Sequence, residues 1–155
     1  MGKVIDNWGE LKMALDAEKA SGRKVVFTNG CFDIIHAGHV SYLKEAKHLG
    51  DVLVVGLNSD SSVSKIKPGR PIVPEHQRAE VLASLDMVDY VTLFGEDTPY
   101  ELIKTLAPDV LVKGGDWKPE NIVGSDIVPE THSLPYVPGI STSEIIARII
   151  KLSDG

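Results

Sequence analysis

One stretch decides the fold of this chain, residues 24–39, which reads Lys24-Val25-Val26-Phe27-Thr28-Asn29-Gly30-Cys31-Phe32-Asp33-Ile34-Ile35-His36-Ala37-Gly38-His39. Its first five residues have the apolar, β-branched character of a buried strand. From His39 to about Leu49, apolar side chains recur every three or four residues, which predicts a helix that ends at Gly50. A strand therefore passes into a helix through a short turn that carries glycines and two histidines.

The alternation of strand-like and helix-like segments continues along the rest of the chain. Buried strands are predicted at residues 51–57, 90–94 and 110–113, and helices at residues 10–20, 75–85, 99–106 and 142–152. Three of these helices follow a capping residue that precedes a glutamate by three positions, namely Asn7, Thr98 and Ser141. Residues 58–73 are polar and contain Pro68 and Gly69, which indicates a functional or mobile loop.

This order of segments predicts an α/β fold. Near-continuous apolar strands that alternate with helices form a parallel sheet with both faces covered, as in Rossmann-like proteins. Right-handed crossovers place ligands outside the carboxyl ends of such strands. We find no repeat, low-complexity segment or linker, so residues 1–155 are expected to form a single domain.

Composition excludes several classes of function. The chain has 155 residues, a net charge of −6 and one cysteine, so it has neither the basic face of a general nucleic-acid binder nor an intrachain disulfide. No apolar run reaches the ~18 residues of a membrane-spanning helix, and no signal pattern is found. We therefore expect a cytoplasmic protein with no nucleic-acid or membrane partner.

His36 and His39 are the most informative polar residues. They are three positions apart at the start of a helix, so both can face the same side, where unpaired amides and the helix dipole favour an anion. Ala37 and Gly38 between them leave room for a phosphate. The alternatives are two unrelated polar residues in a turn, or half of a metal site. A metal site is disfavoured because no further cluster of histidines or cysteines supplies ligands.

The segment Gly30–Asp33 followed by His36-Ala37-Gly38-His39 resembles the signature of the nucleotidyltransferase superfamily that carries the His-x-Gly-His motif. The resemblance extends from Val25 to Ile150. It is strongest to the adenylyltransferase domain of the heptose 1-phosphate enzymes. The superfamily resemblance includes Asn58-Ser59-Asp60, Glu75-His76-Gln77-Arg78, Lys113–Trp117 and Gly139–Ser143. The closer resemblance to the heptose enzymes is carried by Thr28–Asp33, Glu96-Asp97-Thr98-Pro99 and Pro108–Asp116. In many relatives this domain is fused to a sugar kinase, which the present sequence does not contain.

The resemblance implies a reaction and its substrates. AMP would pass from ATP, carried with Mg²⁺, to a heptose 1-phosphate, which gives ADP-heptose for lipopolysaccharide or surface glycans and releases pyrophosphate. Two alternatives remain: a CTP-dependent cytidylyltransferase acting on glycerol 3-phosphate or a similar phosphoalcohol, and a nucleotide-sensing module without catalysis. The resemblance also suggests a homo-oligomer, with a dimer as the first expectation, and no metal site made by the protein alone.

A phosphate acceptor sets the catalytic requirement. A phosphomonoester has its second pKa at about 6 and is largely ionised at neutral pH, so it needs no strong general base. Catalysis then rests on alignment and on stabilising the charge that develops at the α-phosphate. His36 and His39 are expected to donate there, and Cys31 is not expected to act as a nucleophile.

The resemblance carries specific residues over to this chain. His36, His39 and Lys67 are the expected catalytic residues. The residues expected to bind the nucleotide are Asn29, Gly30, Cys31, Phe32, Asp33, Gly38, Asn58, Asp60, Lys65, Arg78, Lys113, Gly115, Asp116, Ser141, Thr142 and Ser143.

Several of these residues have an ordinary structural alternative. Lys65 and Lys67 could be solvated surface lysines, and which of them approaches the phosphates is left open. Arg78 could form a salt bridge with Asp60 or Glu75 instead of contacting the nucleotide.

The remaining polar candidates are similarly open. Asp33 could orient an imidazole or a magnesium-bound water, or cap the turn. Asp116 could bind magnesium or ribose hydroxyls, and Trp117 could stack on a base or sugar or anchor its own loop. The segment Ser141–Glu144 could cap the last helix and also receive phosphate at its N-terminus.

Two departures from the related families bear on the substrates. Tyr136-Val137-Pro138 stands where glycerol-phosphate cytidylyltransferases carry an Arg-Thr-Glu stretch, which disfavours the cytidylyl alternative. The stretch 127–138 is also shorter and richer in proline than in the heptose enzymes, which bears on the sugar acceptor.

Overall fold

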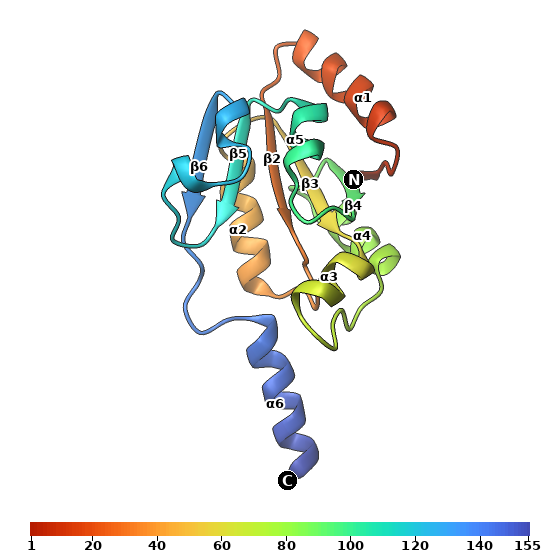
Figure 1. Cartoon of the computed structure of the whole chain (residues 1–155), viewed down its shortest axis with the longest axis vertical. Helices are drawn as coiled ribbons and strands as arrows, with labels where there is room; N and C mark the ends of the chain where they lie inside the picture. The colour runs from red at the N-terminus through yellow and green to blue at the C-terminus, as the bar shows by residue number, and fades with distance from the viewer.

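Six parallel strands form one sheet in the order β1-β4-β3-β2-β5-β6 in the computed structural model, which describes residues 1–155 (Figure 1). The strands are β1 (Lys3–Val4), β2 (Val25–Gly30), β3 (Val52–Asn58), β4 (Tyr90–Phe94), β5 (Val110–Gly114) and β6 (Glu130–Leu134). From β2 the chain moves outward to β3 and β4, and it later returns to the other side of β2 with β5. This reversal places a crevice outside the carboxyl ends of β2 and β5. The predicted Rossmann-like α/β fold is confirmed.

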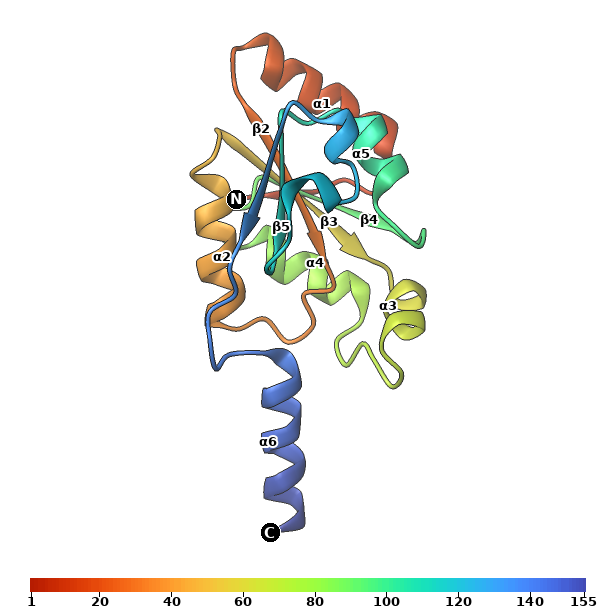
Figure 2. The same cartoon turned by 60° about the vertical axis from the view of Figure 1, so that its left-hand side comes forward.

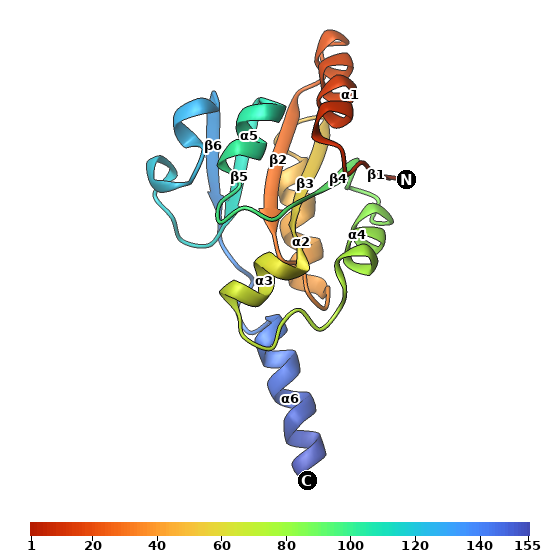
Figure 3. The same cartoon turned by 45° about the vertical axis from the view of Figure 1, so that its right-hand side comes forward.

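Apolar side chains fill both faces of the sheet. Every residue of β3 is buried, and successive residues point into two different cores, with Leu53 and Val55 in one and Val52 and Val54 in the other. The helices α2 (Ala37–Lys47) and α4 (Glu75–Ala83) cover the first core, and α1 (Trp8–Ala20) and α5 (Tyr100–Leu106) cover the second (Figure 3). Burial on both faces explains why the strands are continuously apolar.

Three elements differ from the sequence prediction. The helix α3 (Asp60–Ile66) lies in the first half of the segment predicted as a loop, and the Ser59 hydroxyl caps it by accepting from the Ser62 amide at 3.3 Å. The edge strands β1 and β6 were not predicted, because β1 has two residues and β6 reads Glu-Thr-His-Ser-Leu with no apolar run. Two short 3₁₀ helices, η1 (Pro119–Asn121) and η2 (Ser125–Ile127), connect β5 to β6.

Two of the three predicted helix caps are confirmed. The Asn7 side chain accepts from the Glu10 amide at 3.0 Å, and the Ser141 hydroxyl accepts from the Glu144 amide at 3.1 Å. The prediction at Thr98 is wrong, because α5 begins at Tyr100 and no side chain caps it. Thr98 instead accepts from the Tyr100 amide at 3.4 Å, since Pro99 lies one residue before the helix.

The last helix, α6 (Thr142–Asp154), projects away from the carboxyl-end side of the sheet (Figures 1 and 2). Its first turn contacts the sheet loops through the buried Thr142, while Ile149, Ile150 and Leu152 are 57%, 56% and 75% exposed. None of the helices combines the length and apolarity needed to cross a membrane.

Candidate active site

A cavity of about 660 Å³ opens at the carboxyl ends of β2, β3, β4 and β5. It lies where the sheet order reverses, which is the expected ligand site of such a fold. Most of the predicted site residues line it: Asn29, Gly30, Cys31, Phe32, Asp33, His36, Gly38, His39, Asn58, Lys67, Lys113, Ser141, Thr142 and Ser143. Five do not: Asp60, Lys65, Arg78, Gly115 and Asp116.

His36 and His39 hold each other in place at the N-terminus of α2. The Gly38 amide donates to His36 Nδ1 at 3.1 Å, and the His36 amide donates to His39 Nδ1 at 3.3 Å. The two rings stack with their centroids 3.8 Å apart. Because both Nδ1 atoms accept, the neutral rings carry their protons on Nε2. Each histidine can therefore donate from Nε2 to a ligand.

Both imidazoles are poised to be neutral near pH 7. The pKa of His39 is lowered to about 4, mainly by burial and also by the neighbouring His36 and the Lys67 ammonium. Burial also lowers the pKa of His36. Since an anionic ligand would favour the protonated form, the binding of phosphate opposes these shifts. In the free protein the pair thus supplies two neutral N–H donors at the start of a helix.

The structure separates the two loop lysines. Lys67 is the C-cap residue directly after α3 and lines the cavity. Its charge lowers the pKa of His39 and opposes the burial that raises the pKa of Cys31. Lys65 lies two residues earlier on the exposed surface of α3 and does not line the cavity. Lys67 is therefore the lysine placed beside the histidines.

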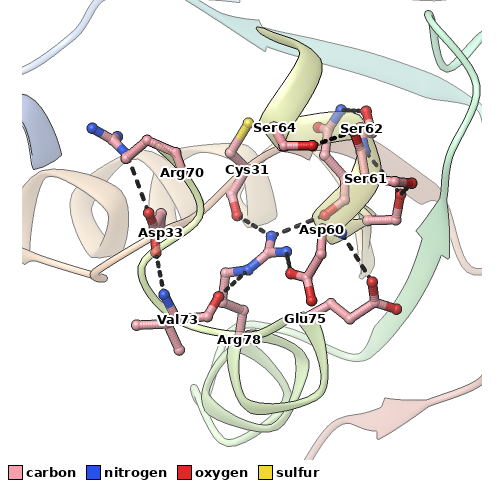
Figure 4. A network of polar contacts seen from close by, with 12 residues as sticks. Cys31, Asp33, Asp60, Ser61, Ser62, Ser64, Arg70, Val73, Glu75 and Arg78 are labelled. Atoms are coloured by element: carbon pink, nitrogen blue, oxygen red, sulfur yellow. Dashed lines mark hydrogen bonds and ion pairs between the residues drawn. The ribbon is translucent and has the colours of Figure 1, made fainter. Parts of the chain in front are cut away.

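Asp33 is buried, and its carboxylate points toward Arg70 and Val73 in the loop that follows α3 (Figure 4). Its Oδ2 accepts from the Ile72 amide at 2.8 Å and from Arg70 Nε at 3.2 Å, and its Oδ1 accepts from the Val73 amide at 2.9 Å. The Asp33 carbonyl accepts from the Thr142 hydroxyl at 2.7 Å. These contacts are within the protein, so the side chain joins loops instead of orienting a histidine.

Arg78 lies outside the cavity, contrary to the expectation that it contacts the nucleotide. Its side chain is 1% exposed. It donates to the carbonyls of Val73, Cys31 and Asn58 at 2.8, 2.7 and 2.9 Å and pairs with Asp60 at 2.7 Å (Figure 4). The alternative of a salt bridge to Asp60 is confirmed. Arg78 therefore braces the segments that follow β2 and β3.

The carboxyl end of β5 divides between two hollows. Lys113 and Gly114 line the main cavity, and burial lowers the pKa of the Lys113 ammonium, whose Nζ lies 5.3 Å from the centre of the Trp117 ring. Gly115 and Asp116 instead line a second, shallower hollow beside β6. Gly115 has a φ of +118°, a conformation that favours glycine.

The N-terminus of α6 closes the side of the cavity next to the histidines. Ser141, Thr142, Ser143 and Glu144 line it. The Ser141 cap satisfies one helix amide, which leaves the earlier amides of the first turn without an intrahelical partner. A helix N-terminus of this kind attracts phosphate. The cap and the ligand-binding interpretations of this segment are thus compatible in one geometry.

Several lining residues were not predicted from the sequence. They include Tyr42, Ile66, Phe94, Asp97, Thr98, Pro99, Gly114, Ile122, Val123, Tyr136, Val137, Gly139, Ile140 and Glu144. Asp97, Thr98 and Pro99 directly follow β4, so the rule that ligands bind at carboxyl ends of strands could have found them. Tyr42 gave no such signal, because its place is fixed by a 2.6 Å contact between its hydroxyl and that of Thr28.

The protein alone forms no metal cage. No group of three or more His, Cys, Asp and Glu side chains is placed to hold a metal ion. Of the carboxylates that line the cavity, Asp33 has its oxygens engaged by Arg70, Ile72 and Val73. The other two lining carboxylates are Asp97 and Glu144. Mg²⁺ typically keeps several waters and binds through substrate phosphates with one or two carboxylates, and these two residues fit that mode.

A protein-family model described as cytidylyltransferase-like matches residues 27–148. Two similar curated relatives are each named "Bifunctional protein HldE". The one from Nitratiruptor sp. is 53% identical over 95% of this chain and 32% of its own length, and the one from Helicobacter pylori is 54% identical over 90% of this chain and 30% of its own length. The chain therefore spans about a third of the length of the curated relatives it matches.

Two solved structures are similar to the chain. A lipopolysaccharide core biosynthesis protein from Thermoplasma volcanium is 32% identical with a TM-score of 0.65, covering 75% of this chain and 99% of that one. A pantoate-beta-alanine ligase from Francisella tularensis has a TM-score of 0.61 over 96% of this chain and 77% of that one. At 16% identity, the second likeness concerns the fold alone.

Proposed function

The chain belongs to the cytidylyltransferase-like family, and from that premise we propose that it transfers AMP from ATP to a heptose 1-phosphate. The products are ADP-heptose, a precursor for lipopolysaccharide or surface glycans, and pyrophosphate. One observation carries the proposal: two neutral imidazole donors, Lys67 and the N-terminus of α6 converge on one cavity. The resemblance to heptose adenylyltransferase domains and the lipopolysaccharide relative support the sugar acceptor.

The proposed reaction is a displacement at the α-phosphorus. A phosphate oxygen of the acceptor forms a bond to that phosphorus, and the bond to the bridging oxygen breaks, so that its electron pair leaves with pyrophosphate. The acceptor is already ionised and needs no base. His36 and His39 donate from Nε2 to the oxygens on which charge develops, and Lys67 neutralises the triphosphate.

Mg²⁺ enters this scheme with the triphosphate as part of the substrate. Its binding to the phosphates would neutralise charge on the leaving group. The lining carboxylates left for its water shell are Asp97 and Glu144, because Asp33 is engaged within the protein. We propose no further cofactor.

The acceptor and the nucleotide are tested together. The purified chain is incubated with Mg²⁺ and ATP or CTP, and with heptose 1-phosphate or glycerol 3-phosphate, and pyrophosphate release is measured for each pair. We expect turnover with ATP and heptose 1-phosphate, and mass spectrometry should identify ADP-heptose. Turnover with CTP alone would refute the adenylyl assignment in favour of the cytidylyltransferase alternative. ATP binding without pyrophosphate release would favour a nucleotide-sensing module.

We also propose that two copies of the chain associate through α6. Its apolar face includes Ile149, Ile150 and Leu152, which no other part of the chain covers. The polar face is balanced by two acidic and two basic side chains, Glu144, Arg148, Lys151 and Asp154, so two such helices do not repel each other. Light scattering on the wild type and on Ile149→Lys tests this: we expect a dimer and a monomer, and a monomeric wild type would contradict it.

A further inference from the structure

Asp33 joins three segments that border the histidine pair. It follows β2 and precedes the histidine turn, and its carboxylate holds the loop after α3 through the amides of Ile72 and Val73. Its carbonyl accepts from the Thr142 hydroxyl and so fixes the start of α6. Figure 4 shows the bonds of the carboxylate to Arg70 and Val73. Asp33 thus ties together the histidine turn, the loop that begins at Lys67 and the first turn of α6.

The loop after α3 depends heavily on this carboxylate. Residues 68–74 include three prolines, at positions 68, 71 and 74, which have no amide hydrogen. Of the four remaining amides, those of Ile72 and Val73 donate to Asp33, and that of Arg70 closes a local turn onto Lys67 at 3.1 Å. A buried carboxylate needs such charge-assisted partners, so these bonds stabilise both the Asp33 carboxylate and the loop.

The backbone around Asp33 is strained in the same place. Phe32 and Ile34, on either side, have φ values of +45° and +47°, which side chains with a Cβ rarely adopt. A β-branched residue such as Ile34 persists there only when its surroundings over-determine the conformation. The bonds of Asp33 supply that constraint, and they direct its side chain to the loop while His36 is left to face the cavity.

We propose that Asp33 is a positioning residue: it places Lys67 against the histidine pair and the α6 N-terminus without contacting the substrate. The effect on turnover rests on the proposed transfer of AMP, whereas the anchoring of the loop does not. Asp33→Asn tests both, because the amide keeps one acceptor oxygen but presents an NH₂ donor to a backbone N–H donor.

The anchoring is measured by amide hydrogen exchange in the ligand-free protein. In Asp33→Asn we expect exchange at Ile72 and Val73 to rise at least about tenfold, with Val54 in the central strand unchanged. Asp109→Asn is the matched control, since its carboxylate accepts from the Val25 amide at 2.8 Å at the opposite end of the sheet. It should speed exchange at Val25 and leave Ile72 and Val73 protected. Unchanged exchange at these two amides in Asp33→Asn would overturn the proposal.

The positioning is measured by a double-mutant cycle on kcat. We expect Asp33→Asn to lower kcat about 10- to 100-fold, as a misplaced charge of this kind can. In a Lys67→Met background the same change should cost less than about threefold, and in a Lys65→Met background it should keep its full effect. A full effect in the Lys67→Met background would show that Asp33 does not act through Lys67.

Two further measurements keep the outcomes separate. Turnover of the wild type is measured first, because its absence would refute the proposed function, while the exchange of Ile72 and Val73 would still decide the anchoring. If Asp33→Asn does not fold, Arg70→Met removes one of the three bonds to the carboxylate. Exchange at Ile72 and Val73 should then rise by a smaller factor, and no rise would count against the anchoring.

Discussion

Replacing His39 separates the two functions that the structure gives to its ring. Nδ1 accepts from the His36 amide at 3.3 Å and closes the first turn of α2, whereas Nε2–H is left to donate into the cavity. Asparagine places an oxygen near the position of Nδ1 but has nothing at Nε2. Glutamine reaches the position of Nε2 with an amide N–H but gives up the acceptor near the backbone. Alanine removes both.

The magnitude follows from the number of donors lost. Removing one preorganised donor to a developing negative charge costs about 10²–10³ in kcat. His39→Ala should reach the upper part of this range, because the ring also stacks on His36 at 3.8 Å and holds it in place. His39→Asn should lose about 10²-fold, since the cap remains and only the donor is missing. His39→Gln should retain the most activity of the three while being the less stable of the two amide variants.

The assay is single-turnover release of pyrophosphate at saturating ATP, with thermal unfolding of each variant measured in parallel. Single turnover isolates the chemical step from product release. Equal rates for the Asn and Gln variants would show that the donor at Nε2 has no part in the reaction. A loss of less than about threefold in His39→Ala would contradict the assignment of this residue to transition-state stabilisation.

Other expectations follow from the same geometry. His39 has a pKa of about 4 in the folded protein and about 6.5 in the unfolded chain, so the unfolded state binds more protons between these pH values. The free energy of unfolding should therefore fall as the pH drops from about 6.5 towards 4. Thermal melts over this pH range should show a weaker decline in His39→Gln than in the wild type. Lys67→Met should lower kcat at least about tenfold and Lys65→Met less than about twofold in the pyrophosphate assay, because only the first lines the cavity. Arg78→Met should lower the free energy of unfolding by about 3 kcal/mol in urea denaturation, since it leaves buried carbonyls without donors.

The sequence predicted the parts of the fold that depend on local pattern. The strands β2 to β5 were found because their burial on both faces demands continuous apolar residues. The strand β6 was not predicted because it lies at the sheet edge, where Thr131, His132 and Ser133 are half-buried and need not be apolar. The helix α3 was not predicted because its residues Asp-Ser-Ser-Val-Ser-Lys-Ile have weak helix propensity. The helix depends instead on the Ser59 cap and on the burial of Val63.

The sequence predicted those parts of the site that depend only on where a residue lies along the backbone. The placement of His36 and His39 follows from their spacing at a helix start, and the structure adds the tautomer that spacing could not give. Arg78 shows the opposite case. A long side chain at the start of a helix can reach either a ligand or its own protein, and the choice depends on which carbonyls the folded loops present to it. Here Cys31, directly after β2, and Asn58, the last residue of β3, present carbonyls at 2.7 and 2.9 Å.

The proposed binding of a triphosphate by an acidic chain depends on where its charges lie. Arg78 pairs with Asp60, and Arg70 pairs with Asp33, so both arginines are largely neutralised within the protein. Lys67 and Lys113 line the cavity with no such carboxylate partner, and burial lowers the pKa of Lys113, which marks a site where charge is poorly hydrated. An anion there interacts more strongly than it would in water. In the proposed reaction, the neutral imidazoles donate hydrogen bonds to the developing negative charge without adding positive charge to the free site.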